Sequence, residues 1–592
     1  MTGRGGPEVR GGPVTARFDD LVAGTAWLFR APTRVVVART AAEVRPALRE
    51  VEAAVAGGAW AHGVLSYEAA PGLDPSLAVR GPEDGDPPLV WFGLSDGPTA
   101  APALVGGTST GPWLLDRTDA EHARAVEQVR ALIAAGETYQ VNLTDRLRAP
   151  CADPAALYAD LVLAQRCAYG ALVDTGTHTV ASASPELFLE WSGRRVRTRP
   201  MKGTAARGRT TAEDDAVVAQ LRSSPKERAE NLMIVDLLRN DLGRVAEVGS
   251  VEVTELFTAE RYPTVWQLVS EVRATLRPEV GLVELLAATF PCGSVTGAPK
   301  AAAMQAIADL EASPRGVYCG AVGWLAPPGE PVSGRFSVAI RTAVVAGGQA
   351  VYGAGGGITW SSDAAAERRE LRAKAAVLTA PTGEFELLET LGHTADAGFT
   401  HLPEHLARLA DSADYLGHAC DLAVVVTALE QAVAGRAASR VRLTLDRAGR
   451  VAVTVADLPG TTGPVRLAVD TVPVDSASPW LQHKTTRRDV YTAAAARHPH
   501  ADDVVLVNER GEVTETSIAT LCVRLDGTWW TPPTSSGCLP GTARARLVAE
   551  GVLAERVLAV ADLHAAEELA VVSSLRGWRP AVLLPGLPPG VA

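Results

Sequence analysis

The sequence predicts two mixed α/β domains, of the α+β or α/β class, within one chain of 592 residues. From about residue 14 to residue 378, β-like runs alternate with Ala- and Leu-rich helical runs, which is the pattern of a mixed domain. A breaker, Thr-Ala-Pro-Thr-Gly at 379–383, then interrupts a long helical pattern. A second alternating pattern begins at Phe385 and ends near Leu584. One hydrophobic core rarely serves a chain of this length, so we expect two catalytic domains.

These patterns give five expected segments. We expect a flexible tail at 1–13, a first catalytic domain at 14–378, a linker at 379–384, a second domain at 385–584 and a C-terminal tail at 585–592. The Gly-rich start lacks the apolar segment of a secretory signal. No run of 18 apolar residues occurs, so no membrane span is expected.

Composition excludes some classes of partner and favours one compartment. The net charge of −12 disfavours binding to nucleic acid or to an anionic membrane. An anionic small substrate would therefore need locally placed Arg and Lys side chains. Seven scattered cysteines without a C-x-x-C pair favour neither a disulfide framework nor a zinc site. A reducing cytoplasm fits this usage.

Two lysines, Lys202 and Lys484, are the strongest candidates for covalent chemistry. Each lies in its own polar surroundings, and 282 positions separate them. A lysine amine can bond to a substrate or cofactor when burial or a neighbouring charge lowers its pKa. Two such lysines predict two active sites for consecutive steps.

Two helical segments of the first half carry the same acidic spacing. Glu227 and Glu230 lie within 225–245, and Glu367 and Glu370 lie within 363–378. Residues three apart share a helix face, so two such faces could gather four carboxylates around Mg²⁺. A single E-x-x-E is more often solvated helix surface. The first helix is predicted to bury an apolar stripe made of Leu232, Val235, Leu238 and Leu242.

Further elements could bind an anion. The glycine-rich run 353–357 directly precedes the second acidic helix, where backbone N–H groups could approach an anion, although a plain turn is equally consistent. Residues 291–300 form a second predicted turn-to-helix element with a hydroxyl and a cation. Arg341 ends a strand-like run and could hold a carboxylate at two points.

Five ordered stretches of the first half resemble the chorismate-utilising enzymes, a family that includes anthranilate, aminodeoxychorismate, isochorismate and salicylate synthases. The stretches are 184–186, 200–204, 229–237, 293–300 and 355–358, and the resemblance covers roughly 100–378. It implies a β-sandwich flanked by helices and chorismate as substrate. It also implies that Glu230 and Glu370 hold Mg²⁺, with Glu227 and Glu367 in support.

The same resemblance assigns the remaining site residues. Glu186 would be the general acid for loss of the ring hydroxyl, and Lys202 would be the nucleophile of an aminodeoxychorismate synthase, where anthranilate synthases usually have Ala. The implied substrate-binding residues are Gln140, Thr296, Arg341, Gly356, Gly357 and Lys374.

Two positions bear on the choice of nucleophile. Gln140 stands where water-activating members carry a lysine base, and an amide cannot take a proton from water, so ammonia is the expected nucleophile. Gln267 departs from the histidine that is frequent in the family. The chain has no glutaminase-like Cys segment with a downstream His-x-Glu, so the resemblance implies a separate glutamine amidotransferase subunit, unless free ammonia is used.

The second half resembles the fold-type IV pyridoxal-phosphate enzymes, which include branched-chain and D-amino-acid aminotransferases and aminodeoxychorismate lyase. The resemblance rests on 483–488, on a predicted strand–turn–strand at 504–517, on 537–544 and on a helix at 405–409. It implies that Lys484 carries the cofactor and that Glu515 contacts its pyridine nitrogen. Arg408, Gly541 and Thr542 would bind the cofactor phosphate, and Ser574 would lie in a later loop near the cofactor. Thr520 departs from the Asn of many members, and the family implies a homodimer through this domain.

Together the two resemblances predict synthesis of 4-aminobenzoate. The first half would aminate chorismate to 4-amino-4-deoxychorismate, and the second would eliminate pyruvate from it. One alternative is an anthranilate synthase component fused to an aminotransferase-like domain, against which Lys202 argues. Another is a scaffold for the amidotransferase in which one half has lost activity.

Overall fold

The computed structural model describes residues 14–107, 110–380, 382–458, 460 and 463–585. The predicted N-terminal tail, Pro381 of the predicted linker and all but Pro585 of the predicted C-terminal tail lie outside the described residues. The chain packs as two compact units, one formed by residues up to 207 with 217–383 and the other by 208–216 with residues from 384 onward. The nine residues 208–216 thus pack with the second unit, a grouping that the sequence pattern does not indicate.

The first unit contains two large antiparallel sheets. The first sheet has the strand order β16 (Gly297–Ala298), β8 (Gln140–Pro150), β20 (Gln349–Ile358), β19 (Thr342–Ala346), β10 (Thr179–Ser184), β9 (Tyr169–Asp174), β1 (Val14–Asp20), β2 (Thr25–Arg30) and β6 (Thr99–Ala100), with β7 (Leu114–Leu115) beside β8. The second has the order β13 (Met201–Ala206), β15 (Val265–Thr275), β12 (Arg195–Arg199), β11 (Leu187–Ser192), β18 (Gly334–Val338), β17 (Ala321–Leu325), β4 (Trp60–Leu65), β5 (Val90–Ser95) and β3 (Arg34–Ala38), with β14 (Glu252–Arg261) beside β15.

The two sheets pack face to face around an apolar core. Phe29 of the first sheet and Val64 and Val322 of the second belong to one buried cluster, together with Val173 and Val180. Alternate side chains of a strand point to opposite faces, so one set fills this interior while the other meets the flanking helices. The β-sandwich flanked by helices that the sequence predicts is therefore confirmed.

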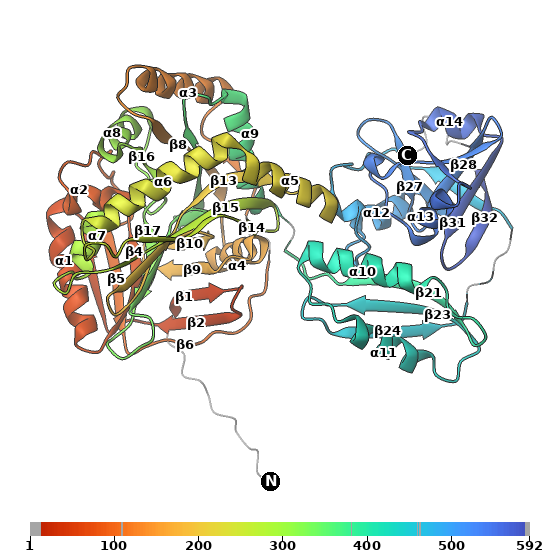
Figure 1. Cartoon of the computed structure of the whole chain (residues 1–592), viewed down its shortest axis with the longest axis horizontal. Coiled ribbons are helices and arrows are strands. Elements are labelled where there is room, and N and C mark those ends of the chain that lie inside the picture. The colour runs from red at the N-terminus through yellow and green to blue at the C-terminus, as the bar shows by residue number, and fades with distance from the viewer. Residues whose placement is uncertain (1–13, 108–109, 381, 459, 461–462, 586–592) are drawn as a thin grey trace, which may run out of the picture. The chain divides into compact units, whose positions relative to one another are not determined.

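Nine α-helices of the described chain belong to the first unit wholly or, in the case of α5, in part, because residues 211–216 of α5 group with the second unit (Figure 1). They are α1 (Ala41–Ala56), α2 (Ala70–Leu73), α3 (Asp119–Ala134), α4 (Pro154–Gln165), α5 (Thr211–Ser223), α6 (Pro225–Gly243), α7 (Leu282–Thr289), α8 (Lys300–Leu310) and α9 (Ala364–Ala375). Helices α1, α6 and α7 contribute to one core with the second sheet, whereas α3 and α8 contribute to another with β8.

Two expectations about local structure in the first unit are wrong. Leu232 is 43% exposed, and Ile234 takes its place in the buried stripe of α6 with Val235, Leu238 and Leu242. The run 353–357 does not directly precede a helix, because it lies in β20 and pairs with β8, and α9 begins only at Ala364. Its glycines permit this pairing, since a Cβ on Gly355 would lie 2.4 Å from the carbonyl oxygen of Leu143.

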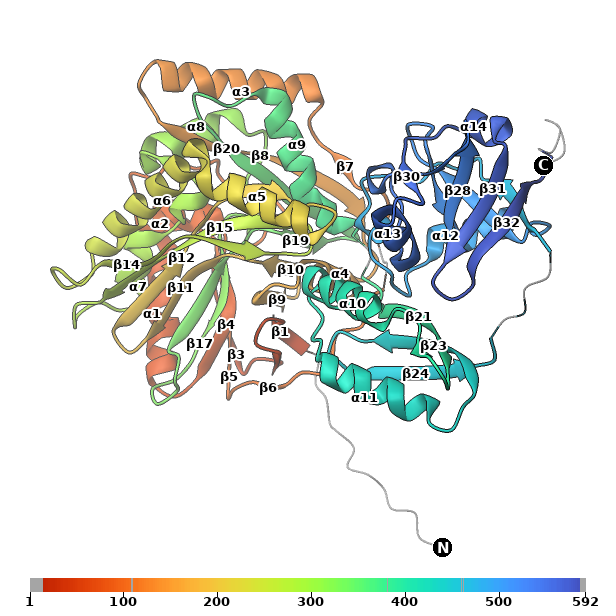
Figure 2. The same ribbon diagram turned by 45° about the vertical axis from the view of Figure 1, so that its right-hand side comes forward.

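The second unit contains a four-stranded sheet, cyan in Figures 1 and 2, and an eight-stranded sheet, blue in the same figures. The smaller sheet has the order β22 (Gly398–Phe399), β21 (Leu387–Thr394), β23 (Ala438–Leu445) and β24 (Val451–Ala456). The larger has the order β27 (Val513–Thr516), β26 (Asp503–Val507), β25 (Val465–Val469), β32 (Gly577–Leu583), β31 (Glu568–Ser573), β28 (Thr520–Leu525), β29 (Thr528–Thr531) and β30 (Ala554–Glu555). Its helices are α10 (Leu402–Leu416), α11 (Leu422–Val433), α12 (Asp489–Arg497), α13 (Thr542–Ala549) and α14 (Val560–Ala565).

Strand alternation organises both sheets of this unit. On β23 every second residue, including Val441 and Leu443, packs against α10 and α11. On β28, Leu521 and Val523 enter one core, whereas Cys522 faces the other side with α13. The larger sheet is therefore covered on both faces, and the prediction of two mixed domains is confirmed. No helix in the described part of the chain is long and apolar enough to cross a membrane.

Candidate active sites

The first candidate site is a cleft in the first unit with an empty volume of about 840 Å³. Strands β13, β15 and β20, helices α6 and α9, and the loops before β11 and β19 contribute to it. Its lining includes Asn142, Glu186, Lys202, Lys226, Glu227, Glu230, Gln267, Ser294, Arg341, Gly355, Gly357, Glu367, Glu370 and Lys374. Segments more than 200 residues apart in the sequence thus meet around one space.

A β-bulge places Lys202 in this cleft. Strand β13 pairs with β15, and the register shifts between Met201 and Thr204. Gly203 within the bulge has a φ of +99°, a value that favours glycine. Bulges commonly re-aim a side chain next to an active site. The carbonyl oxygen of Lys202 accepts a hydrogen bond of 3.2 Å from the Asn231 amide on α6, which fixes the bulge against the helix.

Gln140 lies behind the wall of the cleft. Its side chain is 1% exposed, and neither amide atom has a hydrogen-bond partner. A Cβ added to Gly357 would lie 1.8 Å from Gln140 Nε2 and 2.7 Å from Lys202 Nζ. The side chains of Lys202, the predicted nucleophile, and of Gln140 therefore both pack against Gly357.

Glu186 enters the cleft from the residue before β11. The carboxyl is 2% exposed, and its Oε1 atom has no hydrogen-bond partner. Burial raises the pKa of Glu186 to about 7, although Ser294 and Lys202 act in the opposite direction. A carboxyl with this pKa can be protonated near neutral pH, which is what a general acid requires.

Two capped helices bring four glutamates to the cleft. Pro225 is the first residue of α6, and the Ser224 hydroxyl accepts a hydrogen bond from the Glu227 backbone N–H at 3.4 Å. Asp363 caps α9 by accepting from the Ala366 N–H at 2.8 Å. These caps set the start of each helix and hence the position of its E-x-x-E face.

The electrostatic surroundings of the four glutamates differ. Burial raises the pKa of both Glu227 and Glu367, and the neighbouring carboxylate of Glu230 or Glu370, respectively, raises it further. The charge of Lys374 holds the pKa of Glu370 below its usual value, and the Lys374 ammonium lies 2.7 Å from Glu370 Oε1. The glutamates thus repel one another and depend on cations for balance.

Lys226 is a second cation beside these glutamates. Its Nζ atom lies 3.8 Å from Glu230 Oε1, one turn along α6. Burial alone would lower the pKa of Lys226, but the surrounding carboxylates, Glu230 foremost, raise it on balance. Within the described residues, no three carboxylate, imidazole or thiolate groups are spaced to hold a metal ion. Ammonium groups, rather than shared oxygens, balance the cluster in this structure.

Of three other predicted substrate-binding residues, two lie at the cleft or its acidic cluster and one does not. Arg341 lines the cleft with a φ of +52°, and its guanidinium donates to the carbonyl oxygen of Lys374. Gly356 packs on the acidic cluster, because a Cβ there would lie 3.2 Å from Glu367 Oε2. The Thr296 side chain does not reach the cleft, since its hydroxyl donates within its own turn to the carbonyl oxygens of Cys292 and Gly293.

The second candidate site surrounds Lys484 in the second unit. The backbone of this lysine joins the smaller sheet, because its carbonyl oxygen accepts from the Leu388 N–H at 2.9 Å. Burial lowers the pKa of Lys484 to about 8, and the positive charge of Arg408 acts in the same direction. A substantial fraction of the amine is therefore neutral near physiological pH, as covalent bonding to a carbonyl requires.

Glu515 occupies one wall of this site. It lies on β27, the second strand of the hairpin that the sequence predicts, and is 6% exposed. The hydroxyl of Tyr491 on α12 donates to Glu515 Oε1 at 2.7 Å. Burial raises the pKa of Glu515 to about 7. A cationic partner such as a protonated ring nitrogen would restore the ionised form.

Arg408 on α10 is held by a buried carboxylate. Its Nε and Nη2 atoms lie 2.9 and 2.6 Å from the two oxygens of Glu389 on β21, and Nη1 donates to the carbonyl oxygen of Pro540 at 3.3 Å. His405 Nδ1 lies 2.6 Å from Glu389 Oε2. Despite burial, Arg408 and His405 lower the pKa of Glu389 to about 2.

His405 links the remaining predicted residues of this site. Its Nε2 atom lies 2.9 Å from Ser574 Oγ and 3.4 Å from Thr542 Oγ1. Gly541 caps the helix that Thr542 begins, so the backbone N–H groups of its first turn are available to an anion. His405 thus contacts Thr542 and Ser574 directly and shares the Glu389 carboxylate with Arg408.

Comparison with known proteins finds a match to a family model for each half of the chain. Residues 14–380 match the model of the chorismate binding enzyme family, which accounts for more than half of the chain. The chain belongs to the chorismate binding enzyme family. Residues 386–584 match the model of the amino-transferase class IV family.

Relatives of the chorismate binding family agree with this placement. The chain is 40% identical over 289 residues to aminodeoxychorismate synthase component 1 of Klebsiella aerogenes, covering 49% of this chain and 62% of the relative. It is 42% identical over 290 residues to anthranilate synthase component 1 of Streptomyces coelicolor, covering 48% and 56%. Overall, it spans 30% to 62% of the length of the curated relatives compared.

One solved structure supports the fold of the first half. Anthranilate synthase component I from Streptococcus pneumoniae superposes with a TM-score of 0.50 at 24% identity, covering 64% of this chain and 95% of that chain. Identity alone does not separate the aminodeoxychorismate from the anthranilate relatives, so residues in the cleft must do so.

The cofactors that these families imply can be tested against the residues present. For Mg²⁺, the chain offers four carboxylates facing one cleft, and Glu230 Oε1 is buried without a hydrogen-bond partner. Mg²⁺ is usually held by only one or two protein carboxylates together with waters and substrate oxygens, so the type of donor fits even though no three such groups are spaced to hold an ion in the described residues. For pyridoxal phosphate, a lysine of lowered pKa, a buried carboxyl and an Arg–hydroxyl cluster surround one site, and these groups fit as well.

Three residues of these sites lie outside the set that sequence reasoning assigns. The rarity of lysine could have drawn attention to Lys226. Only five of the 56 basic side chains are lysines, and three of the five line the first cleft. Glu389 is a single acid within the apolar run of β21, which is a signal for a buried charge. Tyr491 has no such signal, because aromatic residues on helices usually serve the core.

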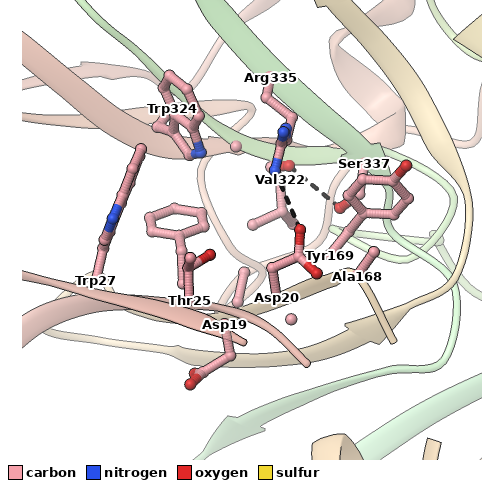
Figure 3. Close-up of a pocket in the computed structure, with 14 residues that line it drawn as sticks. Asp19, Asp20, Thr25, Trp27, Ala168, Tyr169, Val322, Trp324, Arg335 and Ser337 are labelled. Carbon is pink, nitrogen blue, oxygen red and sulfur yellow. Dashed lines mark hydrogen bonds and ion pairs between the residues drawn. The ribbon is translucent and has the colours of Figure 1, made fainter. Parts of the chain in front are cut away.

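A further cleft in the first unit contains none of these residues. It lies between β1, β2, β9, β17 and β18 and has an empty volume of about 430 Å³. Figure 3 shows Trp27 and Trp324 on one side, with Arg335 and Asp20 on the other. Arg335 lies 3.6 Å from Asp20 and 2.6 Å from Glu190, so its charge is balanced within the protein.

Proposed function

We propose that the chain makes 4-aminobenzoate from chorismate in two steps. The first unit exchanges the ring hydroxyl of chorismate for an amino group, giving 4-amino-4-deoxychorismate and water. The second unit eliminates pyruvate from that product. The names of the relatives and the two family matches support this pairing.

The observation that carries the first step is the position of Lys202. It projects from a β-bulge into the cleft, beside a buried amide that cannot act as a base and in the same cleft as a carboxyl of pKa about 7. Lys202 attacks the ring, and Glu186 donates the proton with which the hydroxyl leaves as water. Ammonia then adds at the carbon that lost the hydroxyl and displaces Lys202 as its free amine, and the extra proton of the added nitrogen returns to Glu186.

The carboxylates and cations of the cleft serve binding. Glu230 and Glu370 would hold Mg²⁺, with Glu227 and Glu367 in support, and the ion would supply positive charge for the carboxylates of chorismate. Arg341 and Lys374 supply further positive charge. A separate glutamine amidotransferase delivers the ammonia, as the name component 1 of a relative suggests.

In the second step, Lys484 would hold pyridoxal phosphate and then move protons. The cofactor would supply an electron sink when bound. Glu515 would stabilise the protonated ring nitrogen, whereas Arg408, Thr542 and the N-terminus of α13 would receive the phosphate. The Lys484 amine takes the proton whose loss makes the substrate ring aromatic and returns it as pyruvate leaves. We further propose that the chain acts in the cytoplasm, because its seven cysteines form no disulfide. A homodimer through the second unit is proposed from the resemblance of that unit to fold-type IV enzymes.

A product assay tests the proposal. The full chain is incubated with chorismate, Mg²⁺ and ammonia, with and without pyridoxal phosphate, and the products are separated. We expect 4-aminobenzoate and pyruvate with the cofactor and 4-amino-4-deoxychorismate without it. Formation of anthranilate would overturn the assignment of the first step.

A variant separates the two sites. Lys202→Ala should abolish amination while added 4-amino-4-deoxychorismate is still converted at the wild-type rate. Lys484→Ala should show the reverse pattern. Loss of both activities in either variant would contradict two independent sites.

A further inference from the structure

Lys226 lies beside the acidic cluster of the first cleft, at a position in its helix that is unfavourable for a positive charge. Lys226 is the second residue of α6, where the positive end of the helix dipole disfavours a cation. Its pairing with Glu230 also has the less favourable order along a helix, because the base precedes the acid. By contrast, Glu370 precedes Lys374 on α9 in the favourable order.

The contacts of Lys226 differ from those of Lys374. Lys374 lies 2.7 Å from Glu370 and also donates to the carbonyl oxygen of Gly355 at 2.9 Å, so it is held at two points. Lys226 approaches Glu230 only to 3.8 Å, and its side chain is 45% exposed. Lys226 is therefore attracted to the cluster without being fixed in it, and solvent is open to its long side chain.

The choice of lysine over arginine is informative in this chain. Lysine occurs at Lys202, Lys226, Lys300, Lys374 and Lys484, and the other basic side chains are all arginine. A guanidinium binds carboxylates in a rigid two-point fork, whereas an ammonium is a compact and strongly hydrated charge that is readily exchanged. A lysine beside four glutamates is thus suited to give way to another cation.

We propose that Lys226 is a displaceable counter-ion, whose ammonium balances the glutamates while no divalent ion is bound and withdraws into solvent when Mg²⁺ enters. The inference rests on the proposed function, since it presupposes that this cluster binds Mg²⁺. It assigns Lys226 a role in setting metal affinity, separate from binding substrate or moving protons. Lys226 and the metal compete for the same carboxylates, so each should weaken the binding of the other.

Metal affinity in the full chain provides the test. Mn²⁺, as a probe for Mg²⁺, is titrated by electron paramagnetic resonance at constant ionic strength, because salt screens such pairs. Lys226→Met removes the competitor and should tighten binding by about fivefold, which is the upper range for one partly exposed ion pair. Lys226→Arg should weaken binding, because the fork of the guanidinium holds the carboxylates more firmly.

A matched control separates local competition from net charge. Arg228→Met removes one positive charge two residues along the same helix, where the guanidinium lies 4.9 Å over the ring of Phe257. Its Mn²⁺ affinity should stay within about twofold of wild type, because an exposed charge outside the cluster contributes little. The increase in melting temperature on adding Mg²⁺ should be larger for Lys226→Met than for wild type. Lys226→Gln is measured in parallel as a second neutral variant.

The possible results distinguish failure of the proposed counter-ion role from failure of the proposed function on which it rests. Unchanged or weaker Mn²⁺ binding in both neutral variants would overturn the counter-ion role and leave a Mg²⁺-dependent first step intact. Equal tightening in Arg228→Met would overturn it as well, because net charge would then be the cause. Absence of Mn²⁺ binding to wild type, both with and without chorismate, would overturn the metal site and the inference together.

Discussion

Arg408 and Glu389 form a buried two-point ion pair, with donor–acceptor distances of 2.9 and 2.6 Å. The side chain of Glu389 is 3% exposed, and that of Arg408 is 11% exposed. Breaking such a pair by removing one partner leaves an unbalanced buried charge, which costs roughly 3–5 kcal/mol. This pair fixes the guanidinium that is predicted to receive the cofactor phosphate, so it links the stability of the second unit to its chemistry.

Glu389→Gln should therefore destabilise the second unit strongly. We expect its calorimetric melting transition to fall by roughly 6–12 °C, from about 3 kcal/mol in a unit of this size. The pKa of Glu389 is lowered to about 2, so the pair contributes stability above the unfolded-state pKa near 4.5 and loses it as the pH falls toward 2. The difference from wild type should thus be constant from pH 5 to 8 and shrink below pH 4. Exposed Glu384→Gln serves as control, and an equal loss there would refute the assignment.

Glu186 should give the first step a distinctive pH profile. Its pKa is raised to about 7, so the protonated acid is present below pH 7 and is lost as the pH rises through that value. The rate of chorismate amination should fall up to tenfold per pH unit above 7, and Glu186→Gln should lower it by about 10²–10⁴-fold. The residual rate of the variant should lack this pH limb. If the limb persists in Glu186→Gln, another group is the acid.

Glu186 also makes a prediction about stability. Because the folded-state pKa lies above the unfolded value of 4.5, its contribution is fully present below pH 4.5 and is lost as the pH rises through 7. Wild type and Glu186→Gln should therefore have similar unfolding midpoints at pH 5, whereas the variant should be the more stable protein at pH 8. Urea unfolding of both proteins at the two pH values checks this difference.

Lys484 should capture pyridoxal phosphate with a pH dependence centred near 8. Its pKa is lowered to about 8 by burial and then by Arg408, so about half of the amine is neutral at pH 8 and nearly all of it about one to two pH units higher. The capture rate, followed by absorbance and by borohydride trapping on Lys484, should rise with pH through a midpoint near 8 and level off about one to two pH units above it. Arg408→Gln should move the midpoint upward, because it removes a neighbouring positive charge. A midpoint near that of free lysine in wild type would contradict the inferred environment.

The sequence identifies groups that chemistry requires better than it identifies the backbone that carries them. The spacing of Glu227 with Glu230 and of Glu367 with Glu370 predicts two acidic helix faces, because a helix has a fixed period. The glycines at 353–357, however, allow either a turn or a strand. Their pairing with β8 depends on residues more than 200 positions away, which no local pattern reveals.

Counter-ions are the other part of the sites that local patterns miss. No residue near Arg408 in the sequence indicates that its guanidinium will pair with Glu389. Likewise, no residue near Glu515 indicates that Tyr491 will donate a hydrogen bond to it. These partners are set by how strands and helices pack, so they emerge only in three dimensions. Thr296 shows the converse, since its hydroxyl is satisfied within its own turn and does not reach the cleft.

Alanine substitutions at two glycines of β20 should differ in effect, one lowering mainly the free energy of unfolding and the other mainly the amination activity. A Cβ on Gly355 would lie 2.4 Å from the backbone oxygen of Leu143, which only a shift of the β8–β20 pairing can relieve. A Cβ on Gly357 would instead meet two side-chain ends, Gln140 Nε2 at 1.8 Å and Lys202 Nζ at 2.7 Å. Gly355→Ala should cost about 1–3 kcal/mol of unfolding free energy, as overpacking usually does. Gly357→Ala should cost less stability but displace Lys202 and abolish amination.

Urea unfolding and the two activity assays, run on both variants, measure these effects. Conversion of added 4-amino-4-deoxychorismate in the second unit should be unchanged in Gly357→Ala, because neither displaced side chain belongs to that unit. Gly356→Ala offers an intermediate case, since its Cβ would lie 3.2 Å from Glu367 Oε2 and requires only a small shift of that carboxylate. It should weaken divalent-ion binding more than it weakens folding. Full amination activity in Gly357→Ala would mean that Lys202 is not held against this strand during the reaction, and its proposed role as nucleophile would then lack its geometric support.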